Sequence, residues 1–276
     1  LIGATAGRPT LNGEGLQHQD GHSHILSSTV PNCVSYDPTY AYELAVIVQD
    51  GLRRMYKEME SVFFYITTMN ENYTQPEMPK GSEAGIIKGM YLLEDGESKE
   101  NKVAKPRKGT SGQRLRLLGS GTILREVRKA AETLRKDFGV VTDVWRVTSF
   151  NELRKDALAV DRENMLHPEK KPTASFVTEQ LGKQKGPVIA TTDYMKSYAD
   201  QIREFVPDTY RVLGTDGFGR SDSREKLRHF FEVDAKFVVL AALTELKEQG
   251  AITAKEITDF MKKSGISKNK ANPVSQ

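Results

Sequence analysis

The sequence predicts an α/β protein of two domains, each built on a parallel-rich sheet. Strand-forming runs alternate with helical patterns over residues 33–68 and again over 115–213, and such alternation is typical of parallel strands joined by crossover helices. The composition changes between these stretches, over residues 75–112. At 276 residues the chain is long enough for two modest domains with separate cores.

The first predicted domain spans residues 1–74. Residues 1–32 are rich in Gly, His, Ser, Thr and Asn and show no helical or alternating period before Ile25, which predicts a long ordered loop. A short strand follows at 33–35, then apolar residues at helical spacing over 41–55 and a β-forming run at 62–68. These three elements predict one βαβ unit of a parallel sheet.

Residues 75–112 are predicted to be a linker. Pro76, Pro79 and Gly81 open it, and residues 95–112 contain almost no large apolar side chain. The charged tract from Lys99 to Lys108 could be a docking strip for an acidic partner, but composition favours a solvated connector.

The second predicted domain spans residues 113–276. Its first strand, at 115–118, leads through a glycine turn into a helix over 123–138 that ends at Gly139. Thr253 and Glu256 form a capping-box pattern before the last helix. The other predicted elements are strands at 140–147, 187–191 and 210–213, a helix over about 194–205, and a helix that begins after Asp234.

Composition excludes several classes of protein. The 40 Lys and Arg residues nearly balance the 37 Asp and Glu residues. Many of the basic residues lie near acidic ones in the sequence and do not form one dense block, which argues against a nucleic-acid partner. No apolar stretch approaches the roughly 20 residues of a membrane helix. Cys33 is the only cysteine, which excludes an internal disulfide and fits a reducing, cytoplasmic location. The chain begins at Leu1 with no visible export signal, and we expect this start to be a cut.

Three of the five histidines, His18, His22 and His24, lie within seven residues. They could form a polar turn without chemistry, or a metal site completed by Asp20 or Glu14, although the glycine among them makes a poor helix for aligning ligands. They could also perform proton chemistry, because histidine changes charge near neutral pH and a carboxylate such as Glu14 can hold the tautomer of His18.

The sequence around these histidines, Leu11-Asn-Gly-Glu-Gly-Leu-Gln-His-Gln-Asp-Gly-His-Ser-His24, resembles the homodimeric bacterial type of pyruvate dehydrogenase first component, a transketolase-like family. Pro31-Asn-Cys-Val-Ser-Tyr-Asp-Pro38 carries the same resemblance. The similarity covers nearly the whole chain except the charged linker and the polar tail after Ile266. Further matching stretches follow in the family's order at 65–73, 117–121, 147–153, 164–168, 190–196 and 211–222.

The resemblance implies the end of a pyrimidine-binding middle domain followed by a transketolase-type carboxyl-terminal domain. It implies oxidative decarboxylation of pyruvate on thiamine diphosphate and Mg²⁺, with acetyl transfer to the lipoyl group of a dihydrolipoyl acetyltransferase, in a homodimeric enzyme of the pyruvate dehydrogenase complex. By the same resemblance His18 is the catalytic histidine that faces the substrate-derived oxygen of the thiamine adduct, and Glu14 is its acidic neighbour. A donor placed at such an oxygen stabilises the negative charge that develops there.

The sequence also departs from the family's cofactor site. Thiamine diphosphate enzymes hold Mg²⁺ with a Gly-Asp-Gly segment and downstream asparagines, and activate the aminopyrimidine with a glutamate; neither is in place here. Asp216-Gly217 and Asp95-Gly96 are the nearest segments, and both are expected to be turns. The cofactor-binding residues are therefore unknown, no metal site is expected in this chain, and both cofactors are expected to be held mainly by polypeptide outside it.

Weaker candidates have structural interpretations. Gly119-Ser-Gly121 could bind an anion before a helix but is expected to be a tight turn. Residues 214–222 are expected to shape a strand-to-helix corner and a subunit contact, with Ser221 or Asp222 capping the next helix. His167 and His229 are expected to be structural or surface histidines.

Two alternative functions remain open. A transketolase is the nearest rival, although the Asp-Gly-Pro-Thr-His type segment expected of it is missing. The other alternative is a non-catalytic dimerisation or docking module, which we expect to describe the isolated 276 residues.

Overall fold

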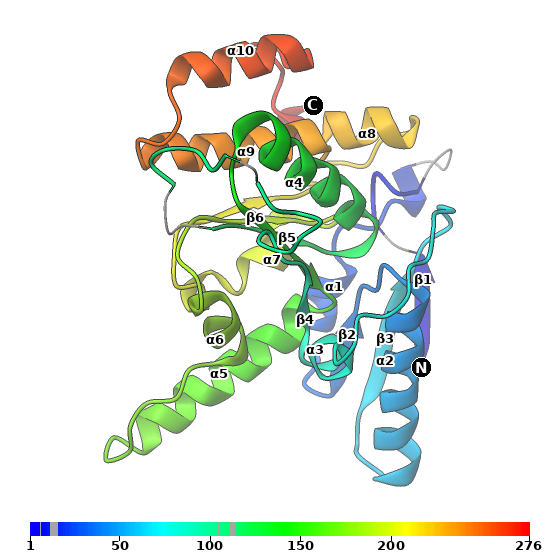
Figure 1. The fold of residues 1–276 in the computed structure, drawn as a ribbon. Helices are drawn as coiled ribbons and strands as arrows, with labels where there is room; N and C mark the ends of the chain where they lie inside the picture. The colour runs from blue at the N-terminus through cyan, green and yellow to red at the C-terminus, as the bar shows by residue number, and fades with distance from the viewer. Residues whose placement is uncertain (6, 12–15, 104, 111–113) are drawn as a thin grey trace.

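The structure is a computed structural model that describes residues 1–5, 7–11, 16–103, 105–110 and 114–276. Two α/β units pack against each other (Figure 1). The smaller unit contains a three-stranded sheet of order β1-β3-β2, in which both pairs are parallel. Its strands are β1 (Ile2–Thr5), β2 (Cys33–Tyr36) and β3 (Phe63–Thr68).

The predicted βαβ unit is confirmed. Helix α2 (Ala41–Leu52) connects β2 to β3 and continues as one π-helical turn, Arg53–Lys57. Glu43 fixes the start of α2, because its Oε2 accepts hydrogen bonds from the backbone N–H groups of Thr39 (2.6 Å) and Tyr40 (3.1 Å). Ile47 on α2 packs with Phe64 and Ile66 of β3 in the core of this unit.

The larger unit contains a five-stranded sheet of order β4-β6-β5-β7-β8. All neighbouring pairs are parallel except β4 with β6. The fold class expected from the sequence, an α/β protein with parallel-rich sheets, is therefore confirmed. The strands are β4 (Met90–Glu94), β5 (Leu115–Gly119), β6 (Thr142–Val147), β7 (Val188–Thr191) and β8 (Tyr210–Leu213).

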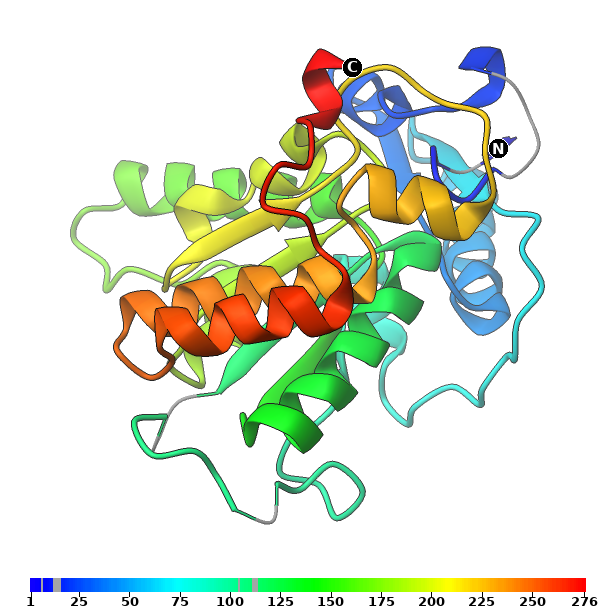
Figure 2. The same cartoon turned by 90° about the horizontal axis from the view of Figure 1, so that it is seen from above.

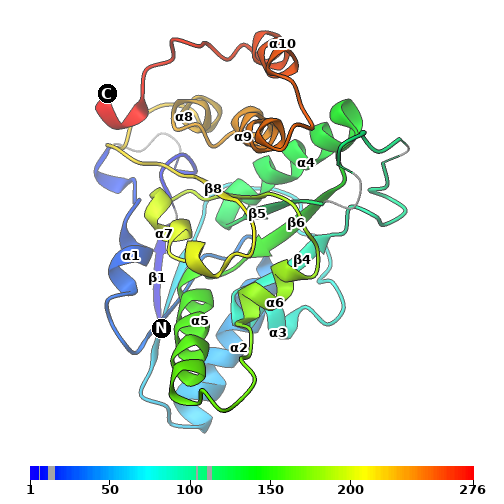
Figure 3. The same cartoon turned by 90° about the vertical axis from the view of Figure 1, so that its left-hand side faces the viewer.

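Helices cover both faces of the larger sheet, as expected for parallel strands (Figures 1 and 3). On one face α4 and α9 bury a core with β5, β6 and β7, and on the other α5, α6 and α7 bury a second core. The helices of this unit are α4 (Leu124–Phe138), α5 (Phe150–Leu166), α6 (Phe176–Gly182), α7 (Lys196–Asp200), α8 (Arg224–Phe230), α9 (Ala235–Glu248) and α10 (Ala254–Ser264).

The predicted helix stops and starts are confirmed at three places. Gly139 ends α4 in the left-handed conformation (φ 65°). Asp234 caps α9 by accepting from Phe237 N–H (3.0 Å). Thr253 and Glu256 form the capping box of α10, with reciprocal bonds of 2.9 and 3.2 Å.

The helix predicted over about 194–205 is confirmed only in part. The chain instead forms the short α7 and a 3-10 turn at Arg203–Phe205. Gln201 lies at the break, where its side-chain amide donates to Tyr198 O (2.7 Å).

The segment predicted as a linker contains regular structure. Helix α3 (Glu83–Lys88) and strand β4 lie within residues 75–112, and β4 joins the larger sheet. The part of this segment that follows β4 runs over the surface beside α4 (Figure 2). The division of the chain into domains at residues 74 and 112 stays a prediction.

Among the residues that the structure describes, no helix is both long and apolar enough to cross a membrane.

Candidate functional site

The carboxyl ends of the strands of both sheets meet at the junction of the two units. Asp37, directly after β2, donates its backbone N–H to Thr148 O after β6 (2.8 Å) and accepts from Gly121 N–H after β5 (3.3 Å). Arg8, after β1, donates its N–H to Asp193 O after β7 (3.4 Å). Parallel α/β sheets place binding sites at this edge, so the junction is the first place to look for function.

The three clustered histidines lie at this junction, on a segment that we call the histidine turn (residues 16–24). It consists of a 3-10 turn, Leu16–His18, and the start of α1 (Ser23–Ser27). Asp20 shapes it by accepting from the backbone N–H groups of His22 (2.9 Å) and Ser23 (3.0 Å). The turn follows β1, and α1 contacts α7 across the junction (Figure 3).

His18 carries an exposed side chain in this chain. The next residue, Gln19, is buried and bonds to the backbone of Arg220 in the larger unit. His18 is thus an exposed residue directly before one that is buried and bonded to the larger unit. Glu14 lies outside the described residues, so the predicted pairing of Glu14 with His18 stays a prediction.

His22 has a different role from His18. Its Nε2 lies 3.3 Å from Arg8 Nη2. Because the arginine side chain only donates hydrogen bonds, Nε2 of His22 is the acceptor in this contact. Arg8 also donates to the carbonyls of Thr215 and Gly217, so His22 helps to orient an arginine that joins the two units.

His24 is a core residue, buried completely. Its ring stacks on Tyr198 at 4.8 Å and meets Tyr194 and Tyr65 edge-on at 4.6 and 5.5 Å. Burial lowers the pKa of His24 to about 3, so the ring is neutral. The structure therefore favours the structural interpretation for His24.

A hydrogen-bonded chain links His24 to a buried carboxyl group. Thr67 Oγ1 donates its proton to Asp37 Oδ1 (2.9 Å). The Thr67 hydroxyl oxygen can then accept a hydrogen bond from His24 Nε2 (3.1 Å). Burial raises the pKa of the Asp37 carboxyl to about 6, against the nearby Arg146 guanidinium, which lowers it. These hydrogen bonds connect α1, the end of β2 and β3.

The metal interpretation gains no support from this arrangement. His24 Nε2 is engaged with Thr67 in the core, and His22 Nε2 with Arg8. Over residues 1–5, 7–11, 16–103, 105–110 and 114–276 there is no group of three or more His, Cys, Asp or Glu side chains that could hold a metal ion.

A buried ion pair connects the two units at their junction. Arg146 of β6 and Glu43 of α2 are both fully buried, and Arg146 Nε lies 2.9 Å from Glu43 Oε1. Arg146 also donates to Asp37 O (2.5 Å) and Gly119 O (3.2 Å). Tyr91 OH donates to Glu43 Oε1 (2.6 Å), so the carboxylate is fully supplied with donors.

A second buried carboxyl group, Asp193, lies after β7. Thr10 Oγ1 donates to its Oδ2, while Oδ1 has no hydrogen-bond partner among the described residues. Burial raises the pKa of Asp193 to about 8. Asp193 is thus predominantly protonated at neutral pH.

Asp193 predicts a pH dependence of stability. The folded state retains a proton between about pH 4 and 8 that the unfolded state has released, so this group's contribution to stability is lost as pH rises through the folded-state pKa. We expect Asp193→Asn to abolish this pH-dependent loss. Between pH 5 and pH 9 the free energy of unfolding of the unsubstituted chain should therefore fall by on the order of a few kcal/mol more than that of the variant. Urea unfolding at both pH values checks this, with Asp200→Asn, an exposed aspartate, as the control. If the free energy of unfolding changed equally with pH in the unsubstituted chain, Asp193→Asn and Asp200→Asn, the prediction would be contradicted.

Two glycine-containing segments have structural roles. Gly121 has φ 48°, and a Cβ there would lie 2.6 Å from Asp37 Oδ2, so Asp37 fills the space of the possible anion site and the turn interpretation is favoured. The loop of residues 214–222 contacts the histidine turn through Arg220, which bonds to Gln19, and contacts Arg8 through Gly217. Helix α8 is preceded by Ser223 as the N-cap residue, so the predicted capping by Ser221 or Asp222 is wrong; Asp222 Oδ1 instead accepts from Ser223 N–H (2.7 Å).

The remaining histidines are surface or structural groups. His167, after α5, pairs with Glu163 and Glu169, and His229 of α8 lies 3.0 Å from Asp234. The two Asp-Gly segments are turns with engaged carboxylates. Asp216 Oδ1 accepts from Lys196 N–H (3.1 Å), and Asp95 pairs with Arg114.

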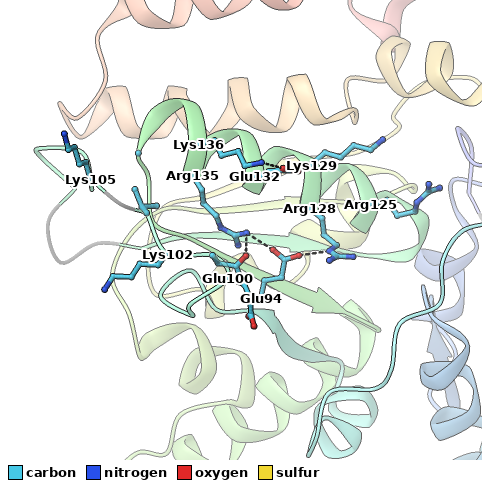
Figure 4. A pocket seen from close by; sticks show the side chains of 13 residues that line it. Glu94, Glu100, Lys102, Lys105, Arg125, Arg128, Lys129, Glu132, Arg135 and Lys136 are labelled. Atoms are coloured by element: carbon cyan, nitrogen blue, oxygen red, sulfur yellow. Dashed lines mark hydrogen bonds and ion pairs between the residues drawn. The ribbon is translucent and has the colours of Figure 1, made fainter.

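A hollow of about 850 Å³ lies between α4 and the segment after β4 (Figure 4). Its lining is rich in Lys and Arg, as expected for a docking strip that takes an acidic partner. Several of these cations are already paired: Arg128 and Arg135 share Glu94 at 2.6 and 2.7 Å, and Lys136 pairs with Glu132. These pairs belong to α4, so the role of the charged tract Lys99–Lys108, as a solvated connector or a docking strip, stays a prediction.

Comparisons with known proteins identify the family. Residues 89–234 match the family described as transketolase-like TK C-terminal domain, and residues 1–76 match the pyruvate dehydrogenase E1 component middle domain. The chain therefore belongs to the transketolase-like family. Its relatives within that family are proteins named pyruvate dehydrogenase E1 component, which confirms the resemblance drawn from the sequence.

Two of these relatives give the scale of the match. The protein from Pseudomonas aeruginosa is 62% identical over 275 residues, which is 99% of this chain and 30% of that protein. The protein from Escherichia coli K12 is 57% identical over the same share of this chain and 29% of its own length. This chain thus spans about 30% of the length of the relatives it matches.

Solved structures support the fold. Transketolase from Campylobacter jejuni superposes with a TM-score of 0.60 at 16% identity, covering 88% of this chain and 31% of that one. A chain described as split gene transketolase, inactive beta4 tetramer, superposes with a TM-score of 0.52 at 16% identity, covering 84% of this chain and 63% of that one.

Proposed function

We propose that this chain forms the carboxyl-terminal part of an acetyl-transferring pyruvate dehydrogenase. The parent protein decarboxylates pyruvate on thiamine diphosphate and passes the acetyl group to the lipoyl group of dihydrolipoyl acetyltransferase. One observation carries the proposal: both regions of the chain match, in order, proteins named pyruvate dehydrogenase E1 component at 50–62% identity over nearly its whole length. The histidine turn at the edge shared by the two sheets supports it.

His18 is the donor to the substrate in this proposal. The carbonyl oxygen of pyruvate gains negative charge when its carbon is attacked, and an imidazole N–H held beside that oxygen stabilises the charge. An exposed side chain directly before the buried Gln19, which bonds to the larger unit, fits this role, since the group must meet a ligand and still be held. Glu14 is the acidic partner of His18 in the same proposal.

The described residues do not fit the diphosphate or Mg²⁺. They contain no acidic cluster for a metal ion, and the carboxylates of Asp95 and Asp216 are engaged with Arg114 and Lys196. We therefore assign the diphosphate and Mg²⁺ sites to polypeptide beyond this chain.

The proposal extends to assembly and location. A homodimer and the dihydrolipoyl acetyltransferase are the proposed partners, and the cytoplasm is the proposed location. The single cysteine, Cys33, is buried and unpaired with another cysteine, which fits a reducing compartment.

Two alternatives have support of their own. The likeness to solved transketolases favours a sugar-phosphate enzyme, but the identity of 16% or less in those comparisons supports the fold alone. The short span of this chain, about 30% of its relatives' length, favours a non-catalytic module for these 276 residues in isolation.

The deciding experiment assays the full-length protein with two substrates. We expect decarboxylation of pyruvate with an artificial electron acceptor, dependent on thiamine diphosphate and Mg²⁺, and no transfer from xylulose 5-phosphate. The opposite preference would establish the transketolase alternative. Calorimetry with the isolated chain tests the module, since tight binding of thiamine diphosphate to these 276 residues alone would exclude it.

A further inference from the structure

Two side chains connect the smaller unit to the loop of residues 214–222: Gln19 of the histidine turn, and Arg8, which precedes the turn in the sequence and contacts His22 within it. Arg8 donates to Thr215 O and Gly217 O. Gln19 donates from Nε2 to Arg220 O and accepts from Arg220 N–H at Oε1 (2.7 Å). In Figure 2 the two segments lie side by side, dark blue against gold.

Gln19 makes a close and specific contact. Its side chain is buried, with 8% of the residue exposed, and both ends of its amide are used. A Cβ on Gly219 would lie 2.8 Å from Gln19 Oε1, so the glycine makes room for the amide. We call this two-point contact the Gln19 clamp.

The loop that receives the clamp is itself held in place. Thr215 bonds to the larger unit twice, from N–H to Tyr194 O (2.8 Å) and from Oγ1 to Asp193 O (2.9 Å). The Arg220 guanidinium lies 4.6 Å from the centre of the Phe230 ring on α8. A clamp on this loop therefore ties the turn to a fixed support.

We propose that Gln19 is a positioning residue for His18. The inference rests on the proposed function, in which His18 donates to the substrate oxygen. The Gln19 clamp fixes the peptide directly after an exposed side chain, so it limits the directions in which the imidazole can point. In this proposal the loop of residues 214–222, in the larger unit, contributes to catalysis indirectly, by holding Gln19. It need not contact the substrate itself.

The first test is Gln19→Met in the full-length protein, which keeps the length of the side chain and removes both hydrogen bonds. We expect kcat for pyruvate to fall about ten-fold or more, because misplacing a reacting group by an ångström can cost about 10² in rate. KM for pyruvate is expected to change less than about two-fold, since the interaction lost acts through the donor. Gln17→Met, at an exposed glutamine two residues away, is the matched control and is expected to retain kcat.

A double substitution separates positioning from general loosening of the structure. If Gln19 acts through His18, adding Gln19→Met to His18→Ala is expected to leave kcat at the value of His18→Ala alone, because coupled residues are not additive. Gln19→Glu keeps the acceptor for Arg220 N–H and is expected to lie between the parent and Gln19→Met.

Three results would overturn the inference: an unchanged kcat in Gln19→Met, a loss that multiplies with that of His18→Ala, or a loss that follows the fraction unfolded in urea. Failure of the proposed function looks different. In that case His18→Ala by itself retains the turnover of pyruvate, whatever Gln19→Met does.

Discussion

Replacement of His18 by alanine in the full-length protein is expected to lower the turnover of pyruvate about 10²–10⁴-fold, the range typical of a positioned acid or base. The side chain is exposed in this chain, so its loss removes little packing, and we expect the free energy of unfolding to change by less than about 0.5 kcal/mol. Steady-state decarboxylation with an artificial acceptor measures the first quantity and urea unfolding the second.

His167→Ala provides the matched control for His18→Ala. His167 is also a partly exposed histidine, with 39% of its side chain accessible, but it lies beyond α5 beside Glu163 and Glu169. Normal turnover is expected in this control. If His18→Ala turned over pyruvate at the parental rate, the histidine turn would return to the interpretation of a polar turn without chemistry.

Replacement of Arg146 by methionine is expected to give the largest loss of stability. Glu43 would remain as a fully buried carboxylate without its cation, and breaking such a pair typically costs about 3–5 kcal/mol. Trp145, the only tryptophan of the chain, precedes Arg146 on β6 and is buried, so its fluorescence reports unfolding in urea.

Two further variants make the Arg146 experiment specific. Adding Glu43→Leu to Arg146→Met removes the unpaired charge and is expected to restore part of the stability, since a buried pair can be replaced by apolar groups at little cost. Arg53→Ala breaks an exposed pair with Glu58, with side chains 47% and 40% accessible, and is expected to cost less than about 1 kcal/mol. Equal losses in Arg146→Met and Arg53→Ala would contradict the importance of the buried pair.

The sequence predicted the elements whose pattern is local. The apolar spacing over 41–55, the β-forming run at 62–68 and Gly139 after an amphipathic stretch each produce a signal within one element, and each is confirmed. Strand β1 gave no such signal. Ile2–Thr5 is short and contains a glycine, and it is a strand because β3 pairs with it.

The roles of the three clustered histidines depend on tertiary contacts, which the sequence pattern does not show. His24 belongs to a polar stretch by composition, yet Tyr65, Tyr194 and Tyr198 enclose it from other elements. The Gln19 clamp joins residues 201 positions apart, so no local pattern could reveal it. The resemblance to a family singled out His18, whereas spacing alone left three interpretations.

Strand β1 has a practical consequence for work with this chain. Within the described residues it is paired only through β3, so its outer backbone N–H and C=O groups form a template onto which a strand from another molecule can add. Leu1 and Ile2 are 67% and 50% exposed, which makes self-association more favourable still. A charged residue protects such an edge, and Gly3 is the place for it: a side chain there meets nothing within 4 Å, so Gly3→Lys would guard the edge without disturbing the sheet.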